Sequence, residues 1–182
     1  MNLSRYLRKM RGSTHGSPLR VNSSEVIWSW IGGFLGIALL AWFNHSFFTG
    51  TDLTLMIASF GASAVLVYDA VRSPVAQPNN LVGGHIISAM VGVTIWKLCQ
   101  HTPLLAEALA VATAIAAMYL TRTLHPPGGA TALVAVIGSD RIHDLGYLFV
   151  LIPATVGPLL LLLVALVTNN VPRTRRYPEI WF

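Results

Sequence analysis

Long apolar stretches separated by short polar ones dominate this sequence and predict helices that cross a membrane. The stretches cover residues 26–43, 53–71, 81–98, 104–120, 130–137 and 145–167. Most of them approach the roughly 20 residues that a helix needs to span the hydrocarbon core. The stretch 130–137 is too short at about 1.5 Å per residue, so it can cross only as half of a broken element. We therefore expect an all-α membrane protein with about six membrane segments, including two short broken helices.

The polar connectors define the expected ends of these segments. Residues 44–52 are expected to form a polar turn, 72–80 a rigid nonhelical connector and 139–144 a charged turn. Pro153 and Pro158 are expected to kink the last segment. The first segment carries glycines along one side, at positions 32, 33 and 36, which favours close packing against a neighbouring helix.

The motif HPPGGA, from His125 to Ala130, interrupts the apolar pattern. Pro126 and Pro127 cannot continue a preceding helix, but their fixed φ suits the first positions of a new one. The amides from Gly128 to Thr131 then lack partners in the first turn, which makes a partially positive helix end that favours anions. Apolar residues flank the motif on both sides, so this helix start is predicted to lie within the membrane and to face protein or water.

Composition and charge fit a membrane protein with a defined orientation. Of 182 residues, 54% are hydrophobic and 10% are charged. If the short fifth segment crosses, ten of the twelve Lys and Arg residues fall on the side of both tails, leaving only Lys97 and Arg141 opposite. If it turns back, the division is eight to four. The positive-inside rule favours the first arrangement, with basic cytoplasmic tails at 1–25 and 169–182 and a membrane domain at 26–168. We expect the cell membrane, inner or plasma, although the Arg-rich first tail leaves organelle import open.

A weak internal repeat suggests how the short segments meet. Residues 61–67 read GASAVLV and residues 129–135 read GATALVA, and each copy lies in the middle segment of a group of three. An odd number of crossings between the copies inverts the second, which predicts a 3+3 inverted repeat of the kind found in transporters. The helix starts near Gly61 and Gly129 would then face one another near the bilayer midplane, where a small anion can bridge them. The spacing to the preceding segment differs between the two groups, so the symmetry is approximate.

The motifs together resemble the HPP family of small integral membrane proteins. The resemblance is carried by HPPGGATAL from His125 to Leu133, SFGASAVL from Ser59 to Leu66 and SPVAQPNNLVGGH from Ser73 to His85. Members in chloroplasts and cyanobacteria look like nitrite transporters, so the resemblance implies a permease for a small monovalent anion, with nitrite as the first candidate. Many bacterial members have no assigned substrate.

The candidate anion site comprises residues around the two expected helix starts and the nearby histidines. These are Ser59, Gly61, Ala62, Ser63, His85, His125, Gly128, Gly129, Ala130 and Thr131. The polar ones have structural alternatives. His125 can be a proton-sensitive gate or a residue that fixes the helix start, and His85 can face it across the cavity or be an interface histidine bonded to a loop carbonyl. The hydroxyls can donate to the anion or bond to carbonyls of their own helix. A bulky residue at Gly129 is expected to abolish uptake without preventing membrane insertion.

Other functional classes have less support in the sequence. Neither an HxxH nor an HExxH spacing occurs, and His101 belongs to the opposite membrane surface, so we expect no metal and no cofactor. No nucleophile, base and acid form a recognisable catalytic set, so we expect no enzymatic activity. The expected partners are a small inorganic anion, the lipid bilayer and further copies of the chain, without nucleic acid. A non-transporting membrane scaffold or sensor subunit remains the alternative function.

Overall fold

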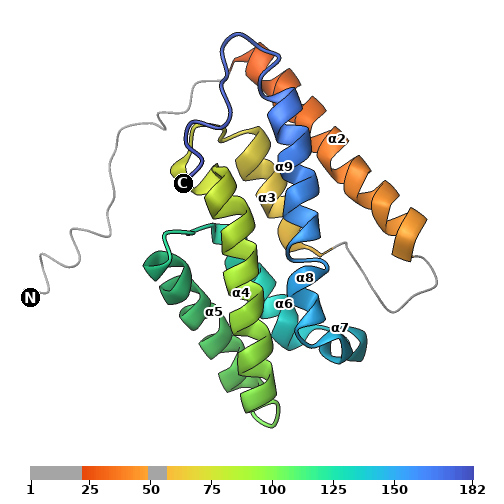
Figure 1. Ribbon diagram of the computed structural model, residues 1–182, viewed down its shortest axis with the longest axis vertical. Helices are drawn as coiled ribbons and strands as arrows, with labels where there is room; N and C mark the ends of the chain where they lie inside the picture. The colour runs from red at the N-terminus through yellow and green to blue at the C-terminus, as the bar shows by residue number, and fades with distance from the viewer. Residues whose placement is uncertain (1–21, 49–56) are drawn as a thin grey trace, which may run out of the picture.

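The computed structural model describes residues 22–48 and 57–182, which fold into a bundle of helices (Figure 1). Its elements are α2 (Ser23–Phe48), α3 (Ser59–Tyr68), η1 (Pro74–Ala76), α4 (Pro78–Cys99), α5 (Pro103–Leu120), α6 (Pro126–Ile137), α7 (Asp140–Leu145), α8 (Leu148–Leu151) and α9 (Val156–Thr168). Four helical stretches are long and apolar enough to span a membrane, namely α2, α4, α5 and the combined α8 and α9, whereas α3 and α6 are shorter. The predicted fold class, with long spans and two short apolar helices, is confirmed.

Prolines begin three of the helices. Pro78, Pro103 and Pro126 occupy the first helical positions of α4, α5 and α6. A proline there gives up no hydrogen bond, because the first amides of a helix have no partner within it. The HPPGGA motif therefore begins α6, as its prolines predict, whereas α5 has already ended at Leu120, before the motif.

Several predicted boundaries were wrong. Residues 44–48 continue α2 instead of turning, the 72–80 connector contains η1 and the first residues of α4, and the charged turn at 139–144 contains most of α7. Pro153 breaks the last segment between α8 and α9, because it offers no amide donor to continue the helix. Pro158 lies in the first turn of α9, where an amide would have no helical partner, so it does not interrupt the helix. The beginning of the predicted 53–71 segment falls on residues 53–56, outside the described residues, and α3 begins at Ser59.

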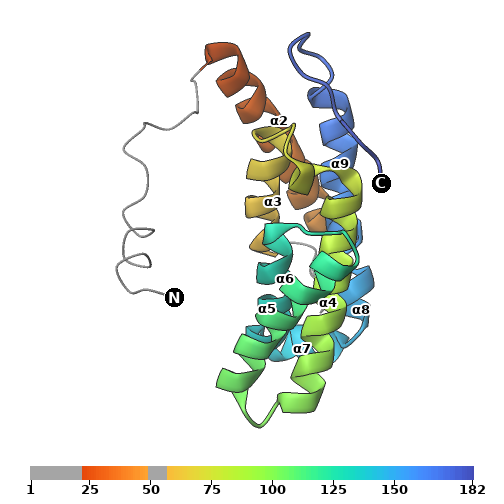
Figure 2. The same ribbon diagram turned by 90° about the vertical axis from the view of Figure 1, so that its left-hand side faces the viewer.

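The packing of the helices follows the predicted inverted repeat. α2 packs against α3 and α9, and α5 packs in the same way against α6 and α4, while α3 packs against α6 and α4 against α9. The number of residues that separates Gly61 from Gly129 also separates α3 from α6. The same number separates α4 from the stretch that contains α8 and α9. The two groups run in opposite directions through the bundle (Figures 1 and 2). α2 therefore begins at the same end of the bundle at which α9 stops.

The glycine face of α2 is used within this chain. A Cβ at Gly32 or Gly36 would overlap the ring of Tyr68 on α3, whereas one at Gly33 would meet nothing within 4 Å. The Tyr68 hydroxyl passes this glycine face and donates to the Leu161 carbonyl on α9, 2.9 Å away. The close approach predicted for the first segment thus joins α2, α3 and α9, and it offers no evidence for a second copy of the chain.

Candidate functional site

Polar side chains gather where α3 and α6 cross in the middle of the bundle. Both short helices begin inside the bundle and run antiparallel (Figures 1 and 2). α3, α6 and the neighbouring α4 contribute five side chains, each no more than 1% exposed: Ser59, Ser63, His85, His125 and Thr131. We call these five residues the polar cluster. It brings hydroxyls and imidazoles together at a depth where the surrounding side chains are apolar.

Short contacts join the cluster into one chain of hydrogen bonds. Ser63 Oγ lies 2.8 Å from His85 Nε2 and 2.9 Å from His125 Nε2. His85 Nδ1 lies 2.6 Å from Thr131 Oγ1, and the Thr131 hydroxyl donates to Ser59 Oγ at 2.9 Å. The far nitrogen of His125, Nδ1, lies 2.7 Å from the carbonyl of Val75, in η1.

Local sequence features set the position of His125. It precedes two prolines and takes an extended conformation, with φ −138° and ψ 106°, as the N-cap of α6. Gly84 lets α4 approach this point, since a Cβ there would lie 2.5 Å from the His125 Cβ and 2.8 Å from the Thr123 carbonyl. Asn80 Nδ2 donates to the Leu124 carbonyl at 2.8 Å, which satisfies the backbone just before the motif. Two successive turns of α4 thus contact the chain segment that leads into α6 and fix its position.

The structure gathers only some of the sequence-predicted site residues. Ser59, Ser63, His85, His125 and Thr131 form the polar cluster, and Gly128 is buried beside it, against α4. Gly61, Ala62 and Ala130 are exposed on the outer surfaces of their helices. Gly129 is half-buried and borders an apolar groove between α5 and α6.

The helix starts are less open than the sequence suggests. The Gly128 amide donates to the His125 carbonyl at 2.8 Å, which uses one of the amides expected to be free. At α3, the Phe60 and Gly61 amides donate to the Ile57 and Ala58 carbonyls. Most of the polar atoms available at this crossing therefore belong to side chains.

Ser88 is a candidate functional residue that sequence reasoning missed. It follows His85 by one turn of α4, is fully buried, and its Oγ has no hydrogen-bond partner among residues 22–48 and 57–182. A Cβ at Gly128 would lie 2.7 Å from this oxygen, so Ser88 faces the first turn of α6. A buried hydroxyl without a partner costs roughly 1–3 kcal/mol, which marks a place where a ligand can restore a bond. The i, i+3 spacing from His85 is the sequence signal that identifies it.

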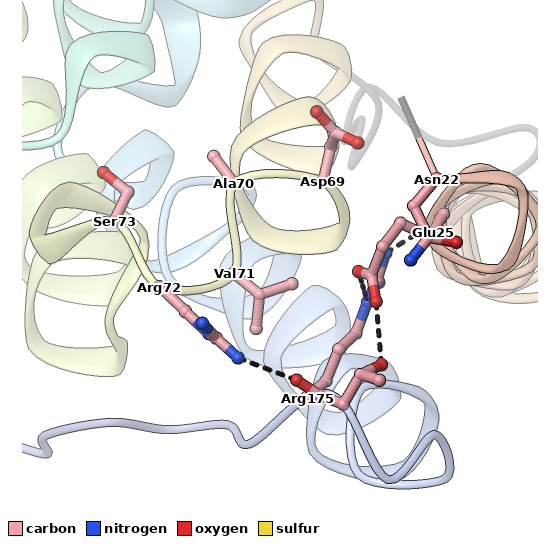
Figure 3. Close-up of a pocket in the computed structure, with 9 residues that line it drawn as sticks. Asn22, Glu25, Asp69, Ala70, Val71, Arg72, Ser73 and Arg175 are labelled. Carbon is pink, nitrogen blue, oxygen red and sulfur yellow. Dashed lines mark hydrogen bonds and ion pairs between the residues drawn. The ribbon is translucent and has the colours of Figure 1, made fainter. Parts of the chain in front are cut away.

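A second polar region lies at the end of the bundle where α2 begins. A cavity of about 570 Å³ is lined there by Glu25, Asp69, Arg72, Arg175 and their neighbours (Figure 3). Arg175 is buried, and its Nε donates to Glu25 Oε2 at 2.6 Å. Its Nη1 and Nη2 donate to the Tyr68 and Glu25 carbonyls, each at 2.8 Å. These hydrogen bonds of Arg175 thus hold the basic segment that follows α9 against the start of α2 and the end of α3.

The same segment also covers the start of α4. The Tyr177 hydroxyl donates to the Ala76 carbonyl at 2.8 Å, and burial raises the pKa of this hydroxyl above its ordinary value. The Glu179 amide donates to Gln77 Oε1 at 2.8 Å. We refer to residues 173–180, with these contacts and those of Arg175, as the C-terminal clasp.

Charged side chains are scarce around the polar cluster. α3, α4 and α6 contain no Asp or Glu, and Lys97 is their only Lys or Arg, more than three turns beyond His85 on α4. Within residues 22–48 and 57–182, His, Cys, Asp and Glu side chains form no group of three that could hold a metal ion. The cluster offers two imidazoles and three hydroxyls, which can donate to a ligand or relay a proton.

Comparisons with known proteins agree on the membrane region. A model of the transmembrane region of HPP proteins matches residues 18–178. Two proteins of Dictyostelium discoideum, both described as transmembrane proteins, are 41% and 39% identical to the chain over 180 and 186 residues. These alignments cover 97% and 100% of this chain but only 57% and 65% of the relatives, so the chain spans about three fifths of their length. No solved structure matches the chain.

Proposed function

The chain belongs to the HPP family of multi-pass membrane proteins, and from this premise we propose that it is a permease for a small monovalent anion, with nitrite as the first candidate. The polar cluster at the crossing of α3 and α6 is the observation that carries the proposal. Nitrite comes first because of the resemblance to nitrite-transporting members of the family, and the cluster supports the wider class of small anions.

The chemistry of the cluster suits an anion. Hydroxyls and imidazole N–H groups donate hydrogen bonds, and α3, α4 and α6 carry no carboxylate that would repel a negative charge. In this conformation the donors bond mainly to one another, and a bound anion takes over some of these bonds. Ser88 adds a donor that has no competing partner.

The free energies permit weak, reversible binding. Transfer of a small anion out of water costs several kcal/mol even after relaxation. Each hydrogen bond to a charged group returns about 1.5–3 kcal/mol, and the start of α6 contributes up to about 2 kcal/mol. Three or four such bonds offset the cost with little excess, which suits a site that must also release its ion.

The orientation and assembly of the permease are part of the proposal. The end of the bundle where α2 begins carries Arg72 and the arginines of the C-terminal clasp, whereas Lys97 and Arg141 mark the other end. The positive-inside rule then favours both tails on the cytoplasmic side, and the cell membrane, inner or plasma, is the location that we propose. A homo-oligomer is proposed because a bundle of this size offers little protein around a solvated pathway.

Uptake into liposomes that contain the purified protein tests the function. Nitrite uptake is measured beside chloride, nitrate and formate at two pH values, with protein-free liposomes as the blank. Saturable nitrite uptake that chloride does not match is the expected result. Absence of flux for every anion, from protein shown to be folded, overturns the proposal and favours a scaffold or sensor in which the cluster only pins α3 to α6.

A matched pair of variants places the anion within the bundle. Ser88→Ala removes the unpartnered donor and is expected to raise the half-saturating nitrite concentration about 10- to 100-fold, the equivalent of one hydrogen bond to a charge. Thr168→Val is the control, because Thr168 is equally a buried hydroxyl but donates to the Val164 carbonyl of its own helix. Equal half-saturation in both variants would remove Ser88 from the site.

A further inference from the structure

Ser63 has too few hydrogens for the contacts that it makes. Its hydroxyl carries one hydrogen, yet its oxygen lies 3.2 Å from the Ser59 carbonyl and within 2.9 Å of an Nε2 atom on two histidines, His85 and His125. The two imidazole contacts are the shorter ones. The hydroxyl can donate to only one of the two nitrogens. Whether the second contact is a hydrogen bond therefore depends on which nitrogens of the two imidazoles carry protons.

The contact with Val75 determines the state of His125. A backbone carbonyl only accepts hydrogen bonds, so the Nδ1 of His125, 2.7 Å from the Val75 oxygen, must carry a hydrogen and donate it. In a neutral imidazole the other nitrogen then has a lone pair. His125 Nε2 is thus an acceptor that requires the hydrogen of Ser63.

The contact with Thr131 determines which nitrogen of His85 carries a hydrogen, by the same count of available hydrogens. Thr131 has one hydroxyl hydrogen and donates it to Ser59 Oγ. The Nδ1 of His85, 2.6 Å from Thr131 Oγ1, must therefore be the donor in that contact. If His85 is neutral, its Nε2 also has a lone pair, and this lone pair faces a Ser63 oxygen whose only hydrogen is already committed to His125.

One additional proton resolves the conflict. A proton on His85 Nε2 turns this nitrogen into a donor to Ser63 Oγ, while Ser63 donates to His125 Nε2. If the proton shifts to His125, the direction of both bonds reverses and both imidazole contacts of Ser63 are still hydrogen bonds. The two imidazoles thus form a site for one proton, shared through the Ser63 hydroxyl.

The part of the chain that the structure describes places no counter-charge beside this proton. Among the residues that the structure describes, the titratable side chains on the helices packed around the pair lie elsewhere: Tyr68 donates to the Leu161 carbonyl, and Lys97, Cys99, Glu107 and Tyr119 lie towards the ends of α4 and α5. No carboxylate from α3, α4 or α6 is present to pair with an imidazolium. A buried charge without a partner is strongly unfavourable, so the proton requires an anion beside it.

We propose that His85 and His125 bind one proton through Ser63 together with the transported anion, so that the protein moves a proton and an anion as an electroneutral pair. This rests on the proposed function and identifies its coupling ion. The proton bonds to the Nε2 lone pair when the anion binds, and it leaves with the anion on the other side. No other co-reactant is involved.

Proton uptake on anion binding tests the inference directly. Nitrite is added to the purified protein in weakly buffered detergent solution near pH 7.5, and a pH-sensitive dye reports the protons taken up per anion bound. The wild-type protein is expected to take up one proton per nitrite. Nitrite binding without proton uptake overturns the inference but leaves the permease intact, whereas absence of both binding and liposome flux overturns the proposed function itself.

Two serine variants separate the proton site from the anion site. Ser63→Ala removes the shared hydroxyl, so proton uptake per bound nitrite is expected to fall to near zero. Ser88→Ala, on the neighbouring turn of α4 from His85, weakens nitrite binding but keeps one proton per anion. A Ser63→Ala protein that still takes up one proton per nitrite overturns the inference.

Liposome flux provides a second readout that does not require Ser63→Ala to be active. With a potential set by potassium and valinomycin, an electroneutral pair is expected to cross at a rate independent of voltage. A lone anion would instead respond to about 2.3 kcal/mol per 100 mV, equivalent to about a 50-fold change in accumulation. Such a voltage response in the wild-type protein contradicts coupling to a proton.

Discussion

Replacement of Arg175 by alanine should destabilise the bundle far more than loss of any neighbouring arginine. Its side chain is only 3% exposed and donates to two backbone carbonyls, those of Tyr68 and Glu25, as well as to the Glu25 carboxylate and Ser29 Oγ. These acceptors belong to α2 and to the end of α3. Arg175 therefore holds two membrane segments to the chain that follows α9.

The magnitude follows from which acceptors lose their partner. A buried acceptor left unsatisfied costs about 1–3 kcal/mol, and the carbonyl of Tyr68 is the most buried one here. The Glu25 side chain is 36% exposed, so water can solvate it after the change and the lost ion pair adds only about 0–1 kcal/mol. Together we expect a loss of about 1–4 kcal/mol in the free energy of unfolding, against a typical total of about 5–15 kcal/mol.

Unfolding in mixed micelles, titrated with SDS and followed by tryptophan fluorescence, measures this loss. The matched control is Arg176→Ala, which removes an exposed arginine from the next position and should change the free energy of unfolding by less than about 0.5 kcal/mol. Amide exchange should also accelerate at Tyr177 and Glu179, whose amides donate from the C-terminal clasp to the side chains of Asn170 and Gln77. Equal stability of the two variants, with unchanged exchange, would refute the view that Arg175 holds the segments together.

Three further predictions concern packing and pH. Gly128→Ala should reduce both stability and uptake, because its Cβ would come within 3.0 Å of a backbone oxygen of α4, whereas Gly129→Ala meets nothing closer than 3.8 Å and should retain uptake. Gly36→Ala should lower the melting temperature by overlap with the tyrosine ring of α3, and Gly33→Ala should not. Because burial raises the pKa of Tyr177, its contribution to stability is complete below its unfolded pKa near 10 and is lost as pH rises above it. Tyr177→Phe should weaken this alkaline loss in a pH series of unfolding measurements.

The sequence predicts the helices well because the physical signals for them are local. Apolar runs of membrane length and prolines at the first helical position are both visible without any tertiary information, and α4, α5 and α6 begin within a few residues of where these signals place them. Boundaries failed where tertiary contacts decide, as at residues 44–48, which continue α2 despite the polar residues 44–46 and end at Phe48, packed against the core. A composition-based turn prediction does not include such contacts.

Only part of the candidate site could be predicted from the sequence. The repeat marks a continuous stretch of residues, whereas only one face of the helix that it forms points into the site. Ser59 and Ser63 are four residues apart and share one face of α3, whereas Gly61 and Ala62 lie between them and point away. The same periodicity turns Ala130 outward and Thr131 inward on α6. The burial of Arg175 could not be predicted for a different reason. Its local sequence does not distinguish it from the exposed Arg173 and Arg176, because its burial depends on contacts with α2 and α3.

The inverted repeat relates the positions of the helices in the two groups but not their chemistry. The spacing that relates Gly61 to Gly129 relates His125 to Ile57 and His85 to Pro153, so the equivalent positions of the other group hold no imidazole. A symmetric pair of sites would place two protonatable groups close together in an apolar interior, where two positive charges would repel each other strongly. With the imidazoles confined to one position, the bundle retains two crossing helix starts but only one proton site. This asymmetry predicts one anion bound per chain at saturation, and two anions per chain would contradict it.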